Sequence, residues 1–590
     1  MNSFLKNVAA TVVGLFVFSI IMSAFAFMSV IGMIASSGAA QPVEENSVLS
    51  ITLGGSLQER SAEAPFGGLF GGALASTGID DVVEAISKAK RNDNIKGIYL
   101  ETGAFTADSY ATLQALRRAL EDFRSSGKWV LAYSDTYTQG GYYVASAADK
   151  VAINPYGQID WHGIGAQPYY LKDLMGKFGV KMQVMKVGSY KSAPETFTAD
   201  AMSPANREQT ARMIGGIWGE MCKAVSKSRK VGVESLNKWA DSLIVFNDTR
   251  DYIGMKLVDK TLYYDEVKAE VRGLLGLEED EDIPQVSVQG MLAAADKDEA
   301  KGDEIAVYYA CGDIVASKKQ NVGAADCIAA EDVCKDLARL AEDEDVKAVV
   351  LRVNSGGGSA YASEQIWRSV KELRKEKPVV VSMGGMAASG AYYISCPANH
   401  IFAEATTLTG SIGIFGMFPD ISGLLTEKLG VKFDEVKTNR NSLYGTAARP
   451  MTQEEMDKAG RYIDRGYALF RSRVAEGRKL TIAQAEAVAQ GRVWLGCDAV
   501  GAKLVDGIGG LDKAVAKAAQ LAKVEEYHTA YYPGKAGWTE MIFGSDPAGN
   551  YLDARARGAL GPLYEPLGLL NGIGSADAVQ ARMLFRITPR

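Results

Sequence analysis

Two short segments in the second half of the chain have the residue types that acyl-transfer chemistry requires. One is N-S-G-G-G (354–358), which directly follows an apolar stretch. Consecutive glycines there let backbone amides approach a ligand with no side chain in the way. The other is G-G-M-A-A-S-G-A-Y-Y (384–393), in which Ser389 stands among small residues where a predicted strand leads into a helix. Either segment alone is typical of a tight turn or a helix N-cap. Together they predict a nucleophilic Ser389, with Gly358 and Gly390 as oxyanion amides.

A nucleophilic serine needs a base, and the chain has only three histidines, His162, His400 and His528. No two of them are close in sequence and none lies in a suggestive motif, which argues against a multi-histidine metal site. The segment V-M-K-V-G-S-Y-K-S-A-P (184–194) instead presents two lysines, Lys186 and Lys191. A lysine can serve as a base when burial keeps it neutral, because desolvation lowers its pKa.

The chain contains an internal duplication with an offset of 250 or 251 residues. D-D-V-V-E-A-I-S-K-A-K (80–90) resembles E-D-V-C-K-D-L-A-R-L-A (331–341), and G-G-Y-Y-V-A-S-A-A-D-K-V (140–151) resembles G-A-Y-Y-I-S-C-P-A-N-H-I (390–401). Two further blocks, starting at residues 113 and 177, resemble blocks starting at 363 and 427. A constant offset over four blocks indicates two copies of one domain.

The two copies differ at the residues that carry the chemistry. Ser389 corresponds to Gln139 in the first copy, and Lys191 corresponds to Ser442 in the second. Each copy has therefore lost the residue that the other retains, which favours one composite Ser389/Lys191 dyad over a solvated surface lysine. Lys186 has a lysine counterpart in the second copy and is better interpreted as common scaffold.

Strands that alternate with helices predict an α/β fold in both copies. The expected strands are continuously apolar, which is typical of parallel sheets covered on both faces. They lie, in pairs of equivalent segments, at 47–53 and 304–310, 96–100 and 347–353, and 129–133 and 378–383.

The N-terminal segment predicts a membrane anchor. From Val8 to about Ala40 the chain has no charged residue, which exceeds the roughly 7–15 residues of a signal-peptide core and the about 20 that a spanning helix needs. Lys6 before it, with Glu44 and Glu45 after it, favours an N-terminus in the cytoplasm and the remaining chain outside. The alternative is a cleaved export signal, with S-G-A (37–39) as a weak cleavage motif.

Five segments follow from these patterns. They are an N-terminal stub and transmembrane anchor (1–45), a first repeat with the general-base lysine (46–277), an acidic linker (278–304), a second repeat with the nucleophilic serine (305–525) and a C-terminal extension (526–590).

The composition is that of a folded protein without a strong charge bias. The chain has 590 residues, 64 Lys and Arg against 71 Asp and Glu, and a net charge of −7. No basic block stands out, which argues against nucleic acid as a partner. The six cysteines form no C-x-x-C pair and are best interpreted as small buried hydrophobic residues, with one or two disulfides open if the chain is exported.

At this level the chain resembles the signal peptide peptidase A family, in its long tandem-domain bacterial form. The resemblance extends over nearly the whole chain. It rests on the anchor, S-Y-K-S-A (189–193), N-S-x-G-G (354–358), A-A-S-G-x-Y-Y (387–393), T-G-S-I-G-I-F-G (409–416) and G-R-V-W-x-G (491–496).

The resemblance implies a tandem duplication of a Clp-protease/crotonase-like domain built from repeated ββα units with parallel sheets. It implies a serine endopeptidase that degrades remnant signal peptides and other apolar peptides at the lipid bilayer of the bacterial cytoplasmic membrane, with its catalytic part on the extracytoplasmic side. Ser389 would be the nucleophile, Lys191 the general base, Gly358 and Gly390 the oxyanion amides, and Ser411 an auxiliary residue that orients the lysine. No metal or cofactor is implied, nor a nucleic acid partner, and the expected assembly is a homotetramer.

Two positions depart from the family pattern. Gly356 stands where the family usually has proline, and Ala391 stands where glycine is common. Neither change removes a dyad residue or a backbone amide.

Two other functions remain open from the sequence. A crotonase-like acyl-CoA enzyme would share the fold and the paired amides, but such enzymes use acidic bases and have no membrane anchor. A non-catalytic membrane scaffold would not need Ser389 and Lys191, each retained in a different copy.

Overall fold

The computed structural model describes residues 13–19, 21–22, 42–61, 77–294, 302–318, 327–535, 579–583 and 587–589. Its first half contains a seven-stranded sheet in the order β2-β1-β3-β4-β5-β7, with β8 paired to β1, and all of these pairings are parallel. The strands of this half, including β6 of a different sheet, are β1 (Ser47–Gln58), β2 (Thr77–Gly78), β3 (Ile95–Ala107), β4 (Trp129–Tyr137), β5 (Lys150–Ile159), β6 (Lys181–Lys186), β7 (Lys260–Thr261) and β8 (Gln285–Ser287).

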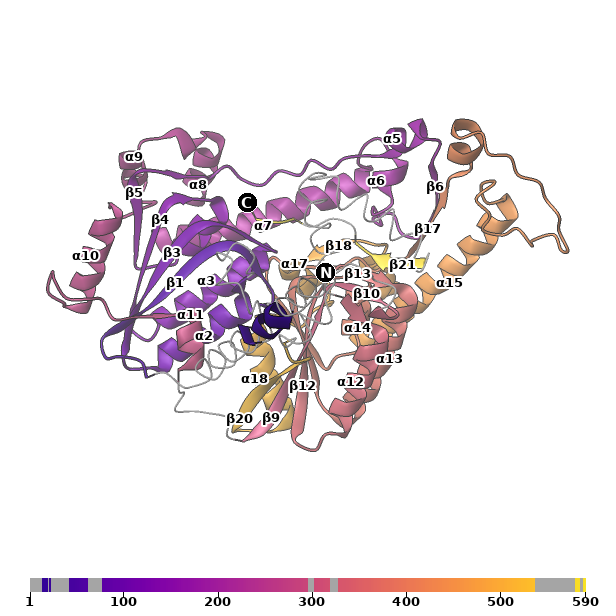
Figure 1. Ribbon diagram of the computed structural model, residues 1–590. Helices are drawn as coiled ribbons and strands as arrows, with labels where there is room; N and C mark the ends of the chain where they lie inside the picture. Colours follow the sequence, from indigo (N-terminus) through magenta and orange to yellow (C-terminus); the bar gives the residue numbers. More distant parts are fainter. Residues whose placement is uncertain are drawn as a thin grey trace, which may run out of the picture.

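The helices of the first half include one long member, α7, which runs through the upper middle of Figure 1 toward α6. They are α2 (Ile79–Arg91), α3 (Tyr110–Arg124), α4 (Gln139–Ala145), α5 (Lys172–Lys177), α6 (Glu195–Thr198), α7 (Pro204–Arg229), α8 (Val233–Asp241), the short 3-10 helix η1 (Ile244–Phe246), α9 (Thr249–Gly254), α10 (Tyr264–Leu275) and α11 (Val288–Ala293).

The second half repeats this plan in an eight-stranded sheet of order β18-β16-β14-β12-β9-β20, in which β15 also pairs with β14 and β19 pairs with β15. Its pairings are parallel except that of β16 with β18. The strands of this half, including those of the third sheet, are β9 (Asp303–Cys311), β10 (Asp313–Val315), β11 (Cys327–Ala329), β12 (Val346–Ser355), β13 (Gly357–Ser359), β14 (Val379–Ala388), β15 (His400–Ala403), β16 (Leu408–Gly410), β17 (Phe415–Asp420), β18 (Val493–Leu495), β19 (Gly507–Ile508), β20 (Tyr527–Tyr532) and β21 (Val579–Arg582).

The helices of the second half follow the same alternation with its strands. They are α12 (Ala330–Glu342), α13 (Ala360–Glu376), α14 (Gly390–Ser395), the π-helical turn η3 (Leu424–Lys428), α15 (Gln453–Arg478), α16 (Ile482–Val488), α17 (Gly496–Gly501) and α18 (Leu511–Ala522). The predicted α/β class, the duplication and the parallel sheets are thereby confirmed.

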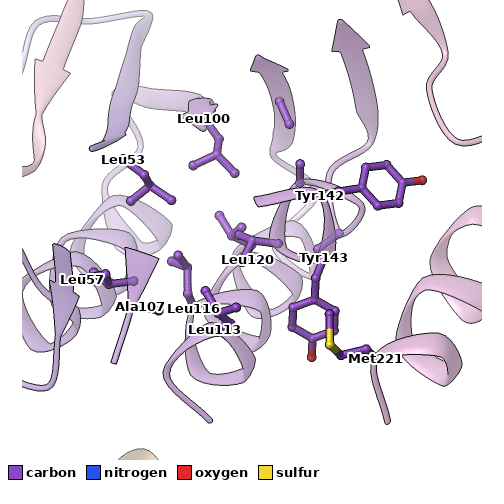
Figure 2. Close-up of a cluster of buried hydrophobic side chains, with 14 of the residues drawn as sticks. Leu53, Leu57, Leu100, Ala107, Leu113, Leu116, Leu120, Tyr142, Tyr143 and Met221 are labelled. Carbon is purple, nitrogen blue, oxygen red and sulfur yellow. The ribbon is translucent and has the colours of Figure 1, made fainter. Parts of the chain in front are cut away.

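Apolar side chains cover both faces of each half's main sheet, which explains the continuously apolar strands. On one face of the first sheet, α3 packs Leu113, Leu116 and Leu120 toward Leu53 and Leu100, as Figure 2 shows. On the other face, α10 contributes Val267, Val271 and Leu275 to a separate buried cluster. In the second half α12 and α13 cover one face and α18 covers the other.

A third sheet joins the two halves. Its six strands run in the order β11-β10-β13-β21-β17-β6, so β6 of the first half ends a sheet that otherwise belongs to the second half (Figure 1, upper right). β6 and β17 are antiparallel over six residue pairs, from Phe415 opposite Lys186 to Asp420 opposite Lys181. This pairing positions the segment after β6 beside the core of the second half.

In each half, the segment that follows the predicted repeat adds one strand to the main sheet. Within the predicted acidic linker, residues 285–293 form β8 and α11, and β8 pairs with β1. Within the predicted C-terminal extension, β20 pairs with β9 in the same parallel sense. An equivalent strand therefore follows the second copy, next to that copy's first strand.

The predicted transmembrane anchor lies largely outside the described residues. Residues 13–19 and 21–22 of that segment are helical. Among the helices that the structure describes, none is long and apolar enough to cross a bilayer.

Candidate active site

Ser389 occupies a sharp turn between a strand and a helix. It directly follows β14 and precedes α14, and its backbone has φ of 58° and ψ of −115°. A non-glycine residue with positive φ costs about 1–3 kcal/mol and persists only where the surroundings impose it. Here its amide donates to the Gly410 carbonyl over 2.8 Å. The geometry is that of a strained turn from a strand into a helix.

The T-G-S element brings a second hydroxyl to the same point. β16 is parallel to β14, with Gly410 opposite Ala388. Ser411 therefore directly follows Gly410, whose carbonyl accepts the hydrogen bond from the Ser389 amide. Ser411 also has positive φ, and its amide donates to the Arg492 carbonyl over 2.7 Å.

Lys191 reaches this point from the first half. After β6 the chain turns through Gly188, and Tyr190 donates its amide to the Gln490 carbonyl over 2.9 Å. Lys191 Nζ then lies 2.8 Å from Ser389 Oγ, 3.1 Å from Ser411 Oγ and 3.2 Å from the Ser411 carbonyl oxygen. These distances join residues of one chain.

Burial sets the charge state of this lysine. Lys191 is 1% exposed, and Ser389 is fully buried. Desolvation lowers the pKa of Lys191 from 10.5 to about 7, because the charged ammonium loses its hydration. A neutral amine has one lone pair and two hydrogens. The lone pair can accept a hydrogen bond from the Ser389 hydroxyl, and the two hydrogens can be donated to the hydroxyl and carbonyl oxygens of Ser411.

The glycine loop lies against the turn that carries Ser389. A side chain on Gly357 would approach the amide nitrogen of Gly390 to 2.6 Å, and Gly357 has φ of 95°, so glycine is required on both counts. Gly358 is in β13 and Gly390 begins α14. The five site residues predicted from sequence are thus brought together in one place.

Sequence reasoning gave no role to Asn354, the first residue of the glycine motif. Its amide nitrogen donates to Asp108 over 3.0 Å and to Glu59 over 3.3 Å, both in the first half. Its amide oxygen accepts from the Met386 amide over 3.1 Å. Asn354 therefore fixes the start of the glycine loop to the strand that leads to Ser389.

Two further residues that the sequence did not single out support Lys191. Gln209, on α7, donates to the Tyr190 carbonyl over 3.1 Å and accepts from the Val493 amide over 3.2 Å. Gly491 packs so closely that a side chain there would lie 2.6 Å from Lys191 Cβ. The G-R-V-W motif contained the signal for Gly491, since that motif borders the lysine; nothing in the local sequence marks Gln209.

In the first half, the position that corresponds to Ser389 is occupied by a glutamine that binds backbone amides. Gln139, the counterpart of Ser389, accepts from the amides of His162 and Gly163 over 3.1 and 2.9 Å. Lys437, the counterpart of Lys186, is paired with Glu435 in the second half. The Nζ atom of Lys186 itself lies 3.8 Å from the Glu195 carboxylate and 3.4 Å from the Lys191 carbonyl oxygen, so it contacts the backbone of Lys191.

Comparisons with known proteins identify the family of this chain. The Peptidase family S49 model matches the chain twice, at residues 122–278 and 371–525, and the Clp protease model matches residues 318–409. The chain is 40% identical to Protease 4 of Salmonella typhi over 81% of its length and 78% of the relative's. It is 36% identical to Protease 4 of Haemophilus influenzae, over 75% and 72% of the two lengths.

The comparisons also match a plant protein and, weakly, a solved structure. The chloroplastic serine protease SPPA of Arabidopsis thaliana is 29% identical over 92% of this chain and 78% of its own. A ClpP1 mutant from Listeria monocytogenes is 17% identical, covers 35% of this chain and 94% of its own, and superposes with a TM-score of 0.24. With two family matches that together span more than half of its residues, the chain belongs to peptidase family S49 and is a serine-type peptidase.

Proposed function

We propose that the protein is a membrane-anchored endopeptidase that degrades cleaved signal peptides by means of a Ser389/Lys191 dyad. The observation that carries this proposal is the 2.8 Å contact between Lys191 Nζ and Ser389 Oγ, at a point where burial lowers the pKa of the lysine to about 7. Membership of a peptidase family favours peptide hydrolysis over acyl-CoA chemistry and over a scaffold without activity.

In the first half of the reaction, neutral Lys191 accepts the hydroxyl proton of Ser389 as Oγ attacks the carbonyl carbon of the substrate. The amides of Gly358 and Gly390 donate to the oxyanion that forms. Lys191, now an ammonium, gives its proton to the leaving amine, and the acyl-enzyme remains. Ser411 holds the amine in line through its contacts of 3.1 and 3.2 Å.

In the second half, a water molecule takes the place of the departed amine. Neutral Lys191 accepts a proton from the water as the oxygen attacks the ester carbon, and the same two amides stabilise the second oxyanion. The proton then returns to Ser389 Oγ, and the product leaves with a new carboxylate. Apart from the substrate and this water, both steps use side chains and amides of this chain.

The proposed substrate and location follow from the N-terminal segment. With residues 8–40 uncharged, the catalytic part would stay at the outer surface of the cytoplasmic membrane, where the apolar cores of cleaved signal peptides remain. Retention of the protein in membranes after alkaline carbonate washing, with the catalytic part digested by protease added to spheroplasts, is the expected result. We propose that it assembles there as a homotetramer, which sedimentation of the detergent-solubilised full chain measures.

Replacing the nucleophile tests the proposed chemistry. Ser389→Ala should abolish labelling by an alkyl fluorophosphonate and lower peptide hydrolysis by at least about a thousandfold, because the residual oxyanion site has no attacking group. The variant should keep the circular dichroism spectrum of the wild type, since one buried hydroxyl is lost.

The matched control is Ser442→Ala, at the exposed counterpart of Lys191 in the second copy. It should be labelled and should turn over peptide like the wild type. Turnover at the wild-type rate by pure Ser389→Ala protein would contradict the nucleophile assignment.

A further inference from the structure

Arg492, the arginine of the G-R-V-W motif, contacts the lysine segment of the first half through its side chain. Its guanidinium carbon lies 4.7 Å from the ring centre of Tyr190, the residue directly before Lys191. One guanidinium nitrogen donates to the Tyr190 hydroxyl over 3.1 Å, and another donates to the Glu208 carboxylate on α7 over 2.9 Å. Tyr190 also donates to Glu208 over 3.0 Å, so each of the three side chains contacts the other two.

The main chain of the same residue contacts the turn beside the serine. The Arg492 carbonyl accepts a hydrogen bond from the Ser411 amide over 2.7 Å. A side chain on Gly410 would approach that carbonyl oxygen to 3.1 Å and a ring carbon of Trp494 to 2.7 Å. The Gly410 carbonyl in turn accepts from the Ser389 amide. Arg492 therefore joins the segment that carries the lysine to the turn that supports the serine.

The guanidinium of Arg492 also contacts a second aromatic ring. Its carbon lies 5.0 Å from the ring centre of Trp494, and the Trp494 indole donates to the Val488 carbonyl over 2.9 Å, which fixes that ring. A planar guanidinium can stack on aromatic rings and donate several hydrogen bonds at the same time, whereas a lysine ammonium cannot reproduce this geometry. The position therefore requires an arginine rather than any positive charge.

The internal duplication shows that this contact is specific to the composite site. The segment K-L-V-D starts at residue 256 in the first copy and at residue 503 in the second, an offset of 247. At that offset Arg492 corresponds to Val245, and at the offset of 251 in the lysine segment Tyr190 corresponds to Asn441. Valine and asparagine cannot form a contact between a guanidinium and an aromatic ring. Like the dyad, the contact combines one residue from each copy.

We propose that Arg492 is a positioning residue, which holds the Lys191 segment against the Ser411 turn and keeps water away from the lysine amine. This role rests on the proposed Ser389/Lys191 chemistry, whose base it positions. Arg492 acts through Tyr190 and Ser411. Desolvation is the cause of the lowered pKa of Lys191, so a gap that admits water beside the amine would restore part of its charge at neutral pH.

The charged groups on the elements around the lysine form pairs with one another. The amine itself contacts only uncharged groups among its hydrogen-bond partners in the described part of the chain, the side chain of Ser389 and the two oxygens of Ser411. The surrounding ion pairs are Lys186 with Glu195, Arg492 with Glu208, and Arg471 with Glu486. Loss of the Arg492 side chain would thus act on the lysine by admitting water, and loss of its charge is a separate effect that a lysine variant tests.

The pH profiles of Arg492→Ala and Arg492→Lys test this role. Both variants should lower kcat/KM for a fluorogenic peptide at pH 7 by at least about tenfold. Both should also move the midpoint of its rise with pH upward by at least about one pH unit, because a hydrated amine is harder to deprotonate. The loss should lie in kcat with KM nearly unchanged, since the base is displaced and the substrate site is not.

Two results in these profiles would overturn the proposal. A wild-type profile in Arg492→Lys would show that the charge matters and the stacked guanidinium does not. A lower rate with an unchanged midpoint would show a general structural loss, which slows the reaction equally at every pH.

Tyr190→Leu removes the other side of the contact and keeps the test decisive if Arg492→Ala does not fold. It should give the same upward shift of the midpoint. Combined with Arg492→Ala it should add little, because both changes remove one contact; additive effects would overturn the proposal. The matched control is Arg465→Ala on α15, which removes a guanidinium 5.6 Å from the Tyr462 ring and should keep the wild-type profile.

Lys191→Arg and fluorophosphonate labelling, measured beside these variants, separate this role from the proposed function. If Lys191→Arg is inactive while Arg492→Ala keeps the wild-type rate and midpoint, the role of Arg492 alone is overturned. If Lys191→Arg keeps the wild-type activity, or the wild-type protein is neither labelled nor active, the dyad is overturned and the role of Arg492 with it.

Discussion

At the scale of single residues, the proposed chemistry depends on a lysine whose pKa is lowered by burial. Lys191 is fully buried, and desolvation is the cause of its lowered pKa of about 7. An exposed lysine has a pKa near 10.4 and would be almost entirely protonated at neutral pH, hence unable to accept a proton. The site thus obtains a base by removing water rather than by adding a charge.

The first prediction concerns pH. Because the pKa of Lys191 is lowered to about 7, the amine is protonated at pH 5 and neutral at pH 9. The value of kcat/KM should therefore rise about tenfold per pH unit below pH 7 and level off above it. Lys191→Arg should lose at least about a hundredfold in kcat/KM at every pH, because guanidinium stays protonated.

Lys186→Ala is the control for this profile. Its ammonium contacts the backbone of Lys191 rather than its amine, so the rise through pH 7 should persist. A Lys191→Arg protein with most of the wild-type activity, or a flat profile in Lys186→Ala, would show that the base is a different residue.

The contact between Ser389 and Lys191 was predictable from the sequence, because the comparison of the two copies singles out these two residues. Gln139 and Ser442 mark the two positions where each copy lost a function, and this comparison needs no structure. Asn354 and Gln209 were not predictable. Their side chains act through backbone groups far away in sequence, and such contacts leave no local pattern.

At the scale of elements, the segment before β18 packs directly against Lys191. Gly491 donates its amide to the Ile412 carbonyl over 2.8 Å and has φ of 75°. Gly491 packs against the backbone and Cβ of Lys191. The distance from Lys191 Nζ to Ser389 Oγ therefore depends on the absence of a side chain at residue 491.

The second prediction is that Gly491→Ala lowers kcat/KM by about a hundredfold, because a Cβ there would lie 2.6 Å from Lys191 Cβ and must displace it. Peptide hydrolysis and the fluorophosphonate labelling rate should fall together. Gly501→Ala, where the new methyl group would meet no atom within 4 Å, should keep wild-type activity. Equal activities in the two variants would refute this role of Gly491.

Element by element, the helices and the central strands could be predicted, but not the third sheet. Strands β1, β3, β12 and β14 are long apolar runs, and α3 and α13 have buried residues at helical spacing. By contrast β13 has three residues and β21 has four. Strands this short take their stability from their neighbours rather than from their own residue preferences, so no sequence pattern marks them.

At the scale of the whole molecule, ion pairs between the halves hold them in register. Glu59, just after β1, accepts from Arg352 on β12 over 2.6 Å, and both side chains are buried. Arg352 also donates to Ser382 on β14 over 2.8 Å. A second pair joins Arg118 of α3 to Glu404, whose carboxylate accepts two bonds of 2.7 and 2.8 Å. The proposed dyad needs this register, because Lys191 comes from the first half and Ser389 from the second.

The third prediction tests this register. Glu59→Gln leaves the charge of Arg352 buried without its counter-charge, and the expected cost is about 3–5 kcal/mol in the free energy of unfolding. The double variant Glu59→Leu/Arg352→Met removes both charges and should recover most of that loss. Urea unfolding followed by tryptophan fluorescence gives both values.

The control is Lys90→Ala, which breaks the exposed pair with Asp122 inside the first half and should cost at most about 1 kcal/mol in the free energy of unfolding. If Glu59→Gln lowered the free energy of unfolding no more than Lys90→Ala, the Glu59–Arg352 pair would not hold the two halves in register. The hydrogen bonds of Asn354 would then be what aligns the glycine loop with Ser389.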